Sequence, residues 1–242
     1  MSAVVASTRP ENFEEMSQPL RAIHREDSRR SPVPPECGVL GRYRGSPSGR
    51  LRSRLRGMIR IIGGRPAPPG KWSWQVAVLN RYKEAFCGGT LISLRWVVTA
   101  AHCVRKRLYV RLGEHDLMVR TQGEVEMRIA EAVIHPQYDP DTVVNDVAML
   151  RLPAPARPDL GHGIACLPQP YHHLPPHTTC IILGWGKKRP TDVHGTRILQ
   201  EAQGITSFGD GCGKRGKYGI YTRTAGYVSW MQHIMKHKYL DE

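Results

Sequence analysis

The chain has 242 residues, of which 40% are hydrophobic and 7% aromatic, and it carries a formal net charge of +14 at pH 7. This length suits a single all-β domain of the barrel type, because such domains often run to about 200–250 residues. No stretch approaches the roughly 18 consecutive apolar residues of a membrane span, so the sequence predicts no transmembrane segment.

Residues 1–60 are predicted to form a flexible basic arm. The stretch is rich in proline at 31–35 and in glycine, serine and arginine at 41–56, with no apolar periodicity that could offset the entropic cost of ordering. Its first thirty residues contain no apolar run of the length that a signal peptide needs, so no signal peptide is visible.

Beyond Arg60 the pattern changes to short β-type runs separated by turns. Each run is rich in β-branched or aromatic residues and is bounded by glycine, proline or charged residues. The runs span residues 75–79, 87–93, 96–99, 109–112, 125–134, 147–152, 180–183 and 219–222. One helix is expected at the C-terminal end, where Tyr227, Met231, Ile234 and Met235 share one face at 3.6-residue spacing.

The positive charge has two interpretations. A basic surface attracts polyanions such as heparan chains and anionic membranes, but it can also serve solubility alone. No motif that reads RNA or DNA accompanies the charge, so nucleic acid is not an expected partner.

The six cysteines favour disulfides over a metal site, because none of them shows the C-x-x-C spacing of zinc ligands. Disulfides imply an oxidising compartment. The histidines His172, His173 and His177 lie in a proline-rich stretch without regular spacing and are expected in a solvated loop. The sequence therefore predicts neither a metal nor a cofactor.

Three segments point to a known chemistry. They are Ile61-Ile62-Gly63-Gly64 after Arg60, Thr99-Ala100-Ala101-His102-Cys103, and Asn145-Asp146-Val147-Ala148-Met149-Leu150. In this order they resemble the trypsin/chymotrypsin family of secreted serine endopeptidases, and the resemblance runs from Arg60 to about Tyr239. It implies two six-stranded antiparallel Greek-key barrels and a C-terminal helix.

The resemblance implies a role for each motif. His102 matches the general base and Asp146 the aspartate that orients the histidine and stabilises its charged form. Cleavage after Arg60 would free the amino group of Ile61, as in zymogen activation; the alternative is that this apolar pair only begins a strand. The implied disulfides join Cys87 to Cys103 and Cys37, in the arm, to Cys166.

The family pattern then breaks, because no Gly-Asp-Ser-Gly-Gly follows. The strand that begins at Ile198 runs directly into Gln203, which matches a much later strand of the family, so the junction lies between Ala202 and Gln203. The nucleophile, both oxyanion-hole amides and several strands are missing. The domain is thus expected at residues 61–242 with an internal truncation near 202–203 and an incomplete second barrel.

After the junction, Ser207, Phe208 and Gly209 match the positions that pair with the substrate backbone, and Gly219 also lines the primary pocket. Ser207 could be considered a substitute nucleophile, but the register that continues on both sides favours the substrate-binding strand.

The sequence therefore predicts a trypsin-like endopeptidase by family, secreted by family, whose partners would be protein substrates or inhibitors. The missing segment predicts that this form is catalytically inactive, as a splice variant would be. The alternative is a non-catalytic pseudoprotease that binds a polyanion or a protein.

Overall fold

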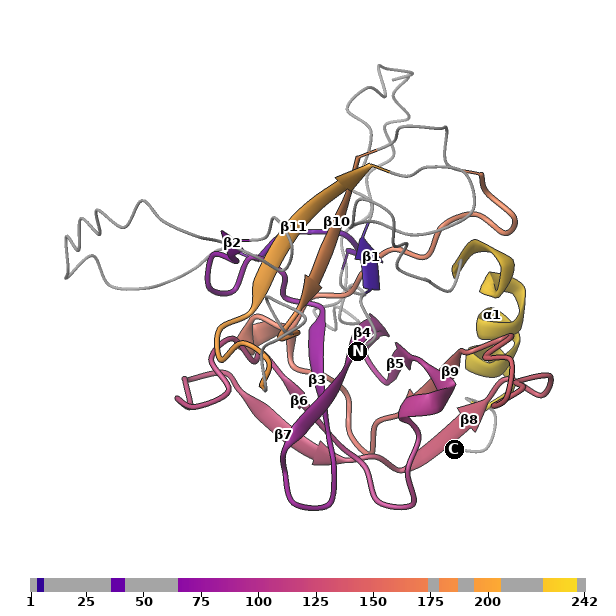
Figure 1. Cartoon of the computed structure of the whole chain (residues 1–242), viewed down its shortest axis with the longest axis horizontal. Helices are drawn as coiled ribbons and strands as arrows, with labels where there is room; N and C mark the ends of the chain where they lie inside the picture. The colour runs from indigo at the N-terminus through magenta and orange to yellow at the C-terminus, as the bar shows by residue number, and fades with distance from the viewer. Residues whose placement is uncertain are drawn as a thin grey trace, which may run out of the picture.

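The computed structural model describes residues 4–6, 36–41, 65–173, 179–186, 194–205 and 224–238. These residues contain two antiparallel β-sheets and one α-helix near the C-terminus (Figure 1). The predicted all-β class with a C-terminal helix is therefore confirmed. In this part of the chain, no helix is long and apolar enough to cross a membrane.

The larger sheet has seven strands in the order β7-β6-β3-β4-β5-β9-β8. Their bounds are β3 (Gln75–Leu79), β4 (Ala85–Ser93), β5 (Trp96–Thr99), β6 (Tyr109–Leu112), β7 (Val125–Arg128), β8 (Glu131–Ile134) and β9 (Ala148–Arg151). Three single-turn 3-10 helices accompany the strands, at Ala101–Cys103, Pro158–Leu160 and Thr224–Gly226.

The order of these strands shows that the larger sheet curls into a barrel. β7 and β8 lie at its opposite edges, yet only residues 129 and 130 separate them in sequence. The Ile129 amide donates to the Leu108 carbonyl at 3.2 Å, and the Ala130 amide donates to the Arg151 carbonyl at 2.9 Å. A sheet whose two edges are joined by so short a link must curl until they almost meet.

The same bend accounts for the number of strands. The sequence predicted a single strand over residues 125–134, and the structure divides that run at the bend into β7 and β8, so the six predicted strands of the first barrel are counted as seven. The physical reason is that the first half pairs with β6 and the second half with β9. The bent segment at residues 125–134 therefore supplies both edge strands of the larger sheet.

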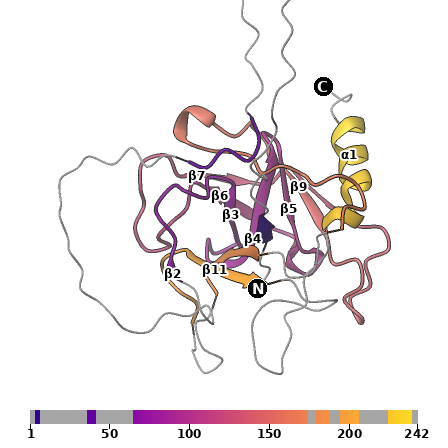
Figure 2. The same ribbon diagram turned by 90° about the horizontal axis from the view of Figure 1, so that it is seen from above.

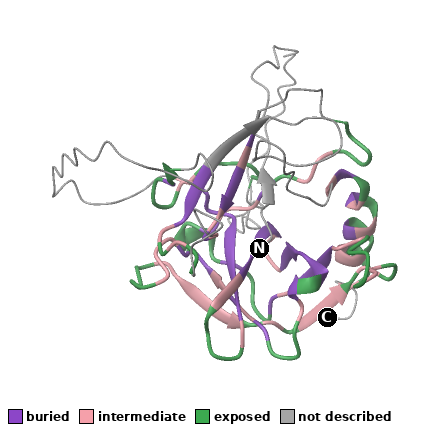
Figure 3. Cartoon of the chain, in the orientation of Figure 1, coloured by how far each residue is buried: buried purple, intermediate pink, exposed green. Residues whose placement is uncertain are grey.

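The core of the barrel consists of the aliphatic side chains that the short runs contribute. All five residues of β3 are buried, and Figure 3 shows buried segments on the central strands and exposed ones in the connecting loops. A second apolar cluster forms outside the barrel, where Met231 of α1 (Val228–His237) packs with Trp96 and Met149. The helix therefore lies beside β9 (Figure 2), with its predicted apolar face turned inward.

The smaller sheet has four strands in the order β1-β10-β11-β2, with β1 at Val4–Ala6, β10 at Thr179–Gly184, β11 at Gln200–Ile205 and β2 at Arg65–Pro66. β11 crosses the predicted junction without interruption. Ala202 pairs with Ile182 and Gln203 pairs with Ile181. The sheet is therefore continuous across the site of the truncation. Within the described residues it has fewer strands than a six-stranded barrel, and the strand predicted at residues 219–222 lies outside them.

Two short parts of residues 1–60 are described, and both make backbone contacts with the rest of the chain. Val4–Ala6 form β1, which pairs with β10. Near Cys37, the Gly38 amide donates to the Ile164 carbonyl at 2.8 Å, and the Gly41 amide donates to the Lys71 carbonyl at 3.0 Å. Composition alone does not predict the pairing of β1, because the outer edge of β10 offers unpaired backbone groups to any segment that can reach it.

Glu201 of β11 ties the smaller sheet to the start of the barrel. Its carboxylate accepts hydrogen bonds from Trp72 Nε1 at 2.7 Å, Arg65 Nε at 2.8 Å and Lys71 Nζ at 3.1 Å, and the side chain is almost fully buried. Burial opposes ionisation of this group, but the three hydrogen bonds outweigh it and hold the pKa of Glu201 below its usual value. The carboxylate is therefore charged at neutral pH, and both of its oxygens accept hydrogen bonds.

Replacing Glu201 by Gln is expected to lower the free energy of unfolding by about 1–3 kcal/mol at pH 7, because the buried indole of Trp72 and the more exposed Arg65 and Lys71 lose their charged acceptor. A lowered folded-state pKa contributes stability that is present above the unfolded pKa of about 4.3 and is lost as the pH falls through the folded value. The difference between wild type and Glu201→Gln should therefore shrink below about pH 4.

Urea denaturation at several pH values measures this difference. The control is Asp159→Asn, which removes an exposed ion pair with Arg157 and should change stability by less than about 1 kcal/mol. Equal effects of the two substitutions at pH 7 would contradict a structural role for Glu201.

Candidate functional site

The pairing of β5 with β9 positions the two residues of the predicted catalytic pair. Thr99, the last residue of β5, pairs with Ala148, the first residue of β9. His102 follows Thr99 by three residues, and Asp146 precedes Ala148 by two. Because both residues leave adjacent strands at the same end, their side chains meet.

Asp146 holds His102 through two separate hydrogen bonds. Its Oδ1 atom accepts from the backbone amide of His102 at 2.8 Å, and its Oδ2 atom lies 2.6 Å from Nδ1 of the His102 ring. An ionised carboxylate can only accept, so Nδ1 carries the proton and Nε2 is left with a lone pair. This is the orientation in which an imidazole can act as a general base.

The pair combines a shielded acid with an accessible base. The side chain of Asp146 is 11% exposed, whereas that of His102 is 42% exposed. The Nε2 atom of the ring lies 3.5 Å from Sγ of Cys103, within the single turn at Ala101–Cys103 that carries the histidine. A reactant could thus approach the ring from solvent while the carboxylate stays behind it.

The C-terminal helix supports the segment that carries Asp146. The hydroxyl of Tyr227 donates to Oδ1 of Asn145 at 2.9 Å, and Nδ2 of Asn145 donates to the Gln137 carbonyl at 2.8 Å. Asn145 itself has a φ angle of 55°, in the left-handed region that asparagine tolerates better than most residues. The sequence predicted Tyr227 only as part of the apolar face of the helix and Asn145 only as part of the aspartate motif, so this contact between them was not predicted.

Aromatic rings extend this support. The ring of His135 makes edge contacts with Tyr227 at 5.3 Å and with Trp230 at 5.0 Å between centroids. Burial lowers the pKa of His135, so the ring is neutral near pH 7. Burial, followed by the nearby charge of Asp146, raises the pKa of Tyr227. His135 and Tyr227 are therefore both uncharged near pH 7.

Two disulfides pin the surrounding loops. Cys87 of β4 is joined to Cys103 beside the histidine, and Cys37 is joined to Cys166. The first bridge fixes the histidine turn to the sheet, and the second fixes residues 36–41 to the barrel. Both pairings agree with those that the family resemblance implied.

The remaining predicted site residues lie outside the described residues. These are Arg60 and Ile61 of the activation site, and Ser207, Phe208, Gly209 and Gly219 of the substrate-binding segment. Their roles stay predictions.

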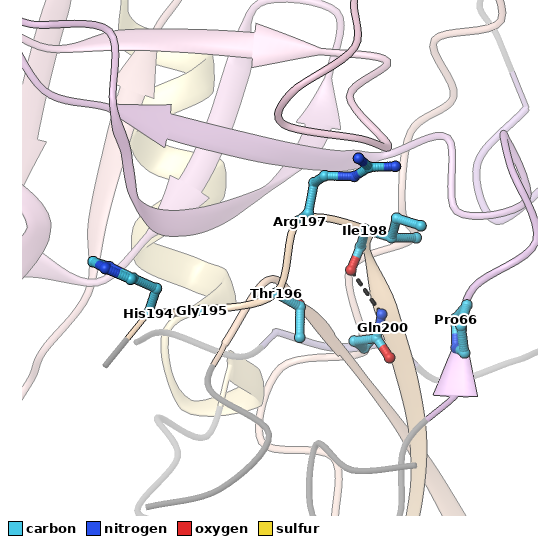
Figure 4. Close-up of a pocket in the computed structure, with 7 residues that line it drawn as sticks. All are labelled: Pro66, His194, Gly195, Thr196, Arg197, Ile198 and Gln200. Atoms are coloured by element: carbon cyan, nitrogen blue, oxygen red, sulfur yellow. Dashed lines mark hydrogen bonds between the residues drawn. The ribbon is translucent and has the colours of Figure 1, made fainter. Parts of the chain in front are cut away.

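A separate hollow of about 400 Å³ is found at the smaller sheet. It is lined by Pro66, His194, Gly195, Thr196, Arg197, Ile198 and Gln200. Figure 4 shows Gln200, the first residue of β11, turned back toward Ile198, where its Nε2 atom donates to the Ile198 carbonyl at 2.7 Å. Neither His102 nor Asp146 lines this hollow, so it is not part of the candidate site.

The sequence is similar to a known protein family and to several of its members. The sequence profile of the Trypsin family matches the chain in two segments, residues 61–202 and 193–231. Human Serine protease 56 is 32% identical over 260 aligned residues, which cover 84% of this chain and 42% of that protein. Pig Trypsin is 29% identical over 225 residues, covering 73% of this chain and 96% of that protein. The chain therefore spans about two fifths of the length of the first relative.

Two details of these alignments bear on the missing segment. The family match divides at residues 193–202, beside the predicted junction. Dog Serine protease 1 aligns over 225 residues that use 90% of its length but 73% of this 242-residue chain, so part of that relative has no counterpart here. Both details are consistent with an internal gap near Ala202.

Replacing Asp146 by Ala is expected to speed hydrogen exchange at the His102 amide, because that amide loses its acceptor, and to lower the free energy of unfolding by about 1–3 kcal/mol. Native-state hydrogen exchange with peptide-level readout over residues 99–104 measures the first effect. Asp141→Ala, at an exposed position in the same loop, is the control and should leave this exchange unchanged. Unchanged protection in Asp146→Ala would contradict the two-bond arrangement.

Proposed function

Because this chain belongs to the trypsin family, we propose that it is a trypsin-like serine endopeptidase by descent whose present form does not hydrolyse peptide bonds. The observation that carries the proposal is the contrast between a formed His102–Asp146 pair and a sequence without Gly-Asp-Ser-Gly-Gly. A general base and its orienting acid cannot form the acyl intermediate of a serine protease without a nucleophilic hydroxyl beside the base.

The missing groups act together in this chemistry. The hydroxyl forms the acyl intermediate, and the backbone amides near it stabilise the oxyanion. Loss of the nucleophile alone lowers kcat of a serine protease by about 10⁶-fold, and the loss of the oxyanion amides removes the remaining stabilisation. Cleavage after Arg60 would not restore activity, because the aspartate that receives the new N-terminus in the family belongs to the same missing segment.

The disulfides indicate the kind of compartment in which the protein folds. Two bridges in the described residues support folding in an oxidising compartment, such as the secretory pathway. The partners expected for the family are protein substrates and their inhibitors, and binding of such a protein without cleavage is compatible with the intact pair.

Hydrolysis provides the direct test. We expect the full chain, before and after cleavage behind Arg60, to hydrolyse Lys- and Arg-containing amide substrates no faster than buffer, and to remain unlabelled by a serine-directed fluorophosphonate probe. Pig Trypsin serves as the positive control. His102→Ala identifies contamination, because contaminating activity would persist in this variant. Hydrolysis that disappears in His102→Ala, or stoichiometric labelling of any serine, would show that the proposal is wrong.

A second candidate function is polyanion binding, and one observation favours it. Residues 105–107, Arg-Lys-Arg, form an exposed cationic run directly after the histidine turn. The guanidinium of Arg105 is fixed there, because Nη1 donates to the carbonyl of His102 at 2.5 Å and to that of Val104 at 3.0 Å. Clustered, fixed cations bind sulfated chains more strongly than the same charges dispersed along a flexible segment.

The test compares two full-length variants of equal charge. Neutralising Arg105, Lys106 and Arg107 to serine should lower the salt concentration at which the protein elutes from heparin more than neutralising Arg50, Arg52 and Arg54 of the N-terminal segment, because a clustered site displaces its counterions together. Equal shifts in the two variants would mean that the net charge is incidental.

A further inference from the structure

The side chains around the His102 turn include an unassigned set of metal-ligand atoms. Sγ of Cys87, Sγ of Cys103 and a ring nitrogen of His102 all lie within 4.8 Å of one another. We propose that reduction of the Cys87–Cys103 disulfide converts this cluster into a zinc site in which two thiolates and His102 Nε2 are the protein ligands. The proposal does not depend on whether the chain hydrolyses peptides.

The spacing of the ligands fits a tetrahedral zinc ion. Zn–S bonds of about 2.3 Å and Zn–N bonds of about 2.0–2.1 Å place sulfur and nitrogen about 3.5 Å apart, and two sulfurs about 3.8 Å apart. His102 Nε2 is already 3.5 Å from Cys103 Sγ. After reduction the two sulfurs have only to separate. The Cα atoms of Cys87 and Cys103 are 6.2 Å apart, so rotation of the two side chains can supply that separation.

The histidine is already oriented as zinc-bound histidines are. Such a ring usually donates its other N–H to a carboxylate, which fixes the tautomer and makes the ligating nitrogen more basic. Asp146 Oδ2 stands 2.6 Å from Nδ1 and provides this contact. The pair that orients the imidazole for proton transfer therefore also orients it toward a metal.

The surroundings leave one coordination position open. The ring of His102 is 42% exposed, whereas Cys103 is buried. Three protein ligands and one side facing solvent leave the fourth position to water.

The chemical step balances with a dithiol as reductant. The dithiol transfers two electrons and two protons to the Cys87–Cys103 bond, which opens to two thiols, and the dithiol becomes a disulfide. The zinc ion then binds both sulfurs and the imidazole and releases the two thiol protons to solvent. In the oxidised chain the two sulfurs are bonded to each other, so the site exists only after reduction.

Cobalt(II) is the probe for the test, because thiolate-bound cobalt has a charge-transfer absorption in the near ultraviolet and a tetrahedral site has visible bands. The full chain is reduced with dithiothreitol, freed of the reductant without oxygen, and titrated with Co²⁺. We expect one equivalent to bind with these bands, Zn²⁺ to bleach them, and the oxidised chain to show none.

Three variants separate this site from the other cysteines. Cys87→Ser/Cys103→Ser should lose the bands although it keeps Cys37, Cys166, Cys180 and Cys212. His102→Ala should shift or lose the visible bands and bind at least tenfold more weakly, and Asp146→Asn should bind about 10–100-fold more weakly. The exposed His173→Ala is the matched control and should bind like the wild type.

Three results would overturn the proposal. They are a reduced wild type without the bands, a double cysteine variant that keeps them, and a His102→Ala variant with the spectrum and affinity of the wild type. Near-ultraviolet circular dichroism of each reduced protein reports folding independently. A reduced wild type that unfolds and binds no cobalt counts against the site.

Discussion

The antiparallel pairing of β5 with β9 is the interaction on which the candidate site depends. Four residue pairs, from Trp96 opposite Arg151 to Thr99 opposite Ala148, align the end of one strand with the start of the other. The carboxylate of Asp146 then closes the gap by accepting from both the backbone and the ring of His102. The pair is therefore part of the fold itself. It forms because the barrel forms, and it needs no nucleophile to be in place.

The smaller sheet is stabilised differently, because, among the described residues, it lacks neighbouring strands that a complete barrel would supply. Segments distant in sequence pair with the strands that remain. Val4–Ala6 extend β10 on one side, and Arg65–Pro66 extend β11 on the other. The buried carboxylate of Glu201 adds an ionic contact between β11 and the entrance to the barrel. A shortened sheet can thus stay folded when the backbone groups at its edges are hydrogen-bonded and its buried carboxylate has partners.

The sequence predicted the first barrel well, because its strands are short apolar runs bounded by turn residues and its motifs are local. The bend between β7 and β8 escaped prediction, since alternating apolar residues over 125–134 do not reveal which partner each half will find. β1 escaped it because three small apolar residues in a basic arm carry no signal of pairing. The supporting contact from Tyr227 to Asn145 joins residues 82 positions apart, and only the packing of α1 brings them together.

The bridge between Cys37 and Cys166 spans 129 positions and encloses Arg60 within its loop. A single cut after Arg60 would therefore divide the polypeptide without releasing either piece. The product would be a covalent heterodimer of unchanged total mass apart from one water molecule, visible as two bands only under reducing electrophoresis. The disulfide would keep the strand at Val4–Ala6 attached to the rest of the protein. Its effective concentration at the edge of β10 would therefore stay high after cleavage.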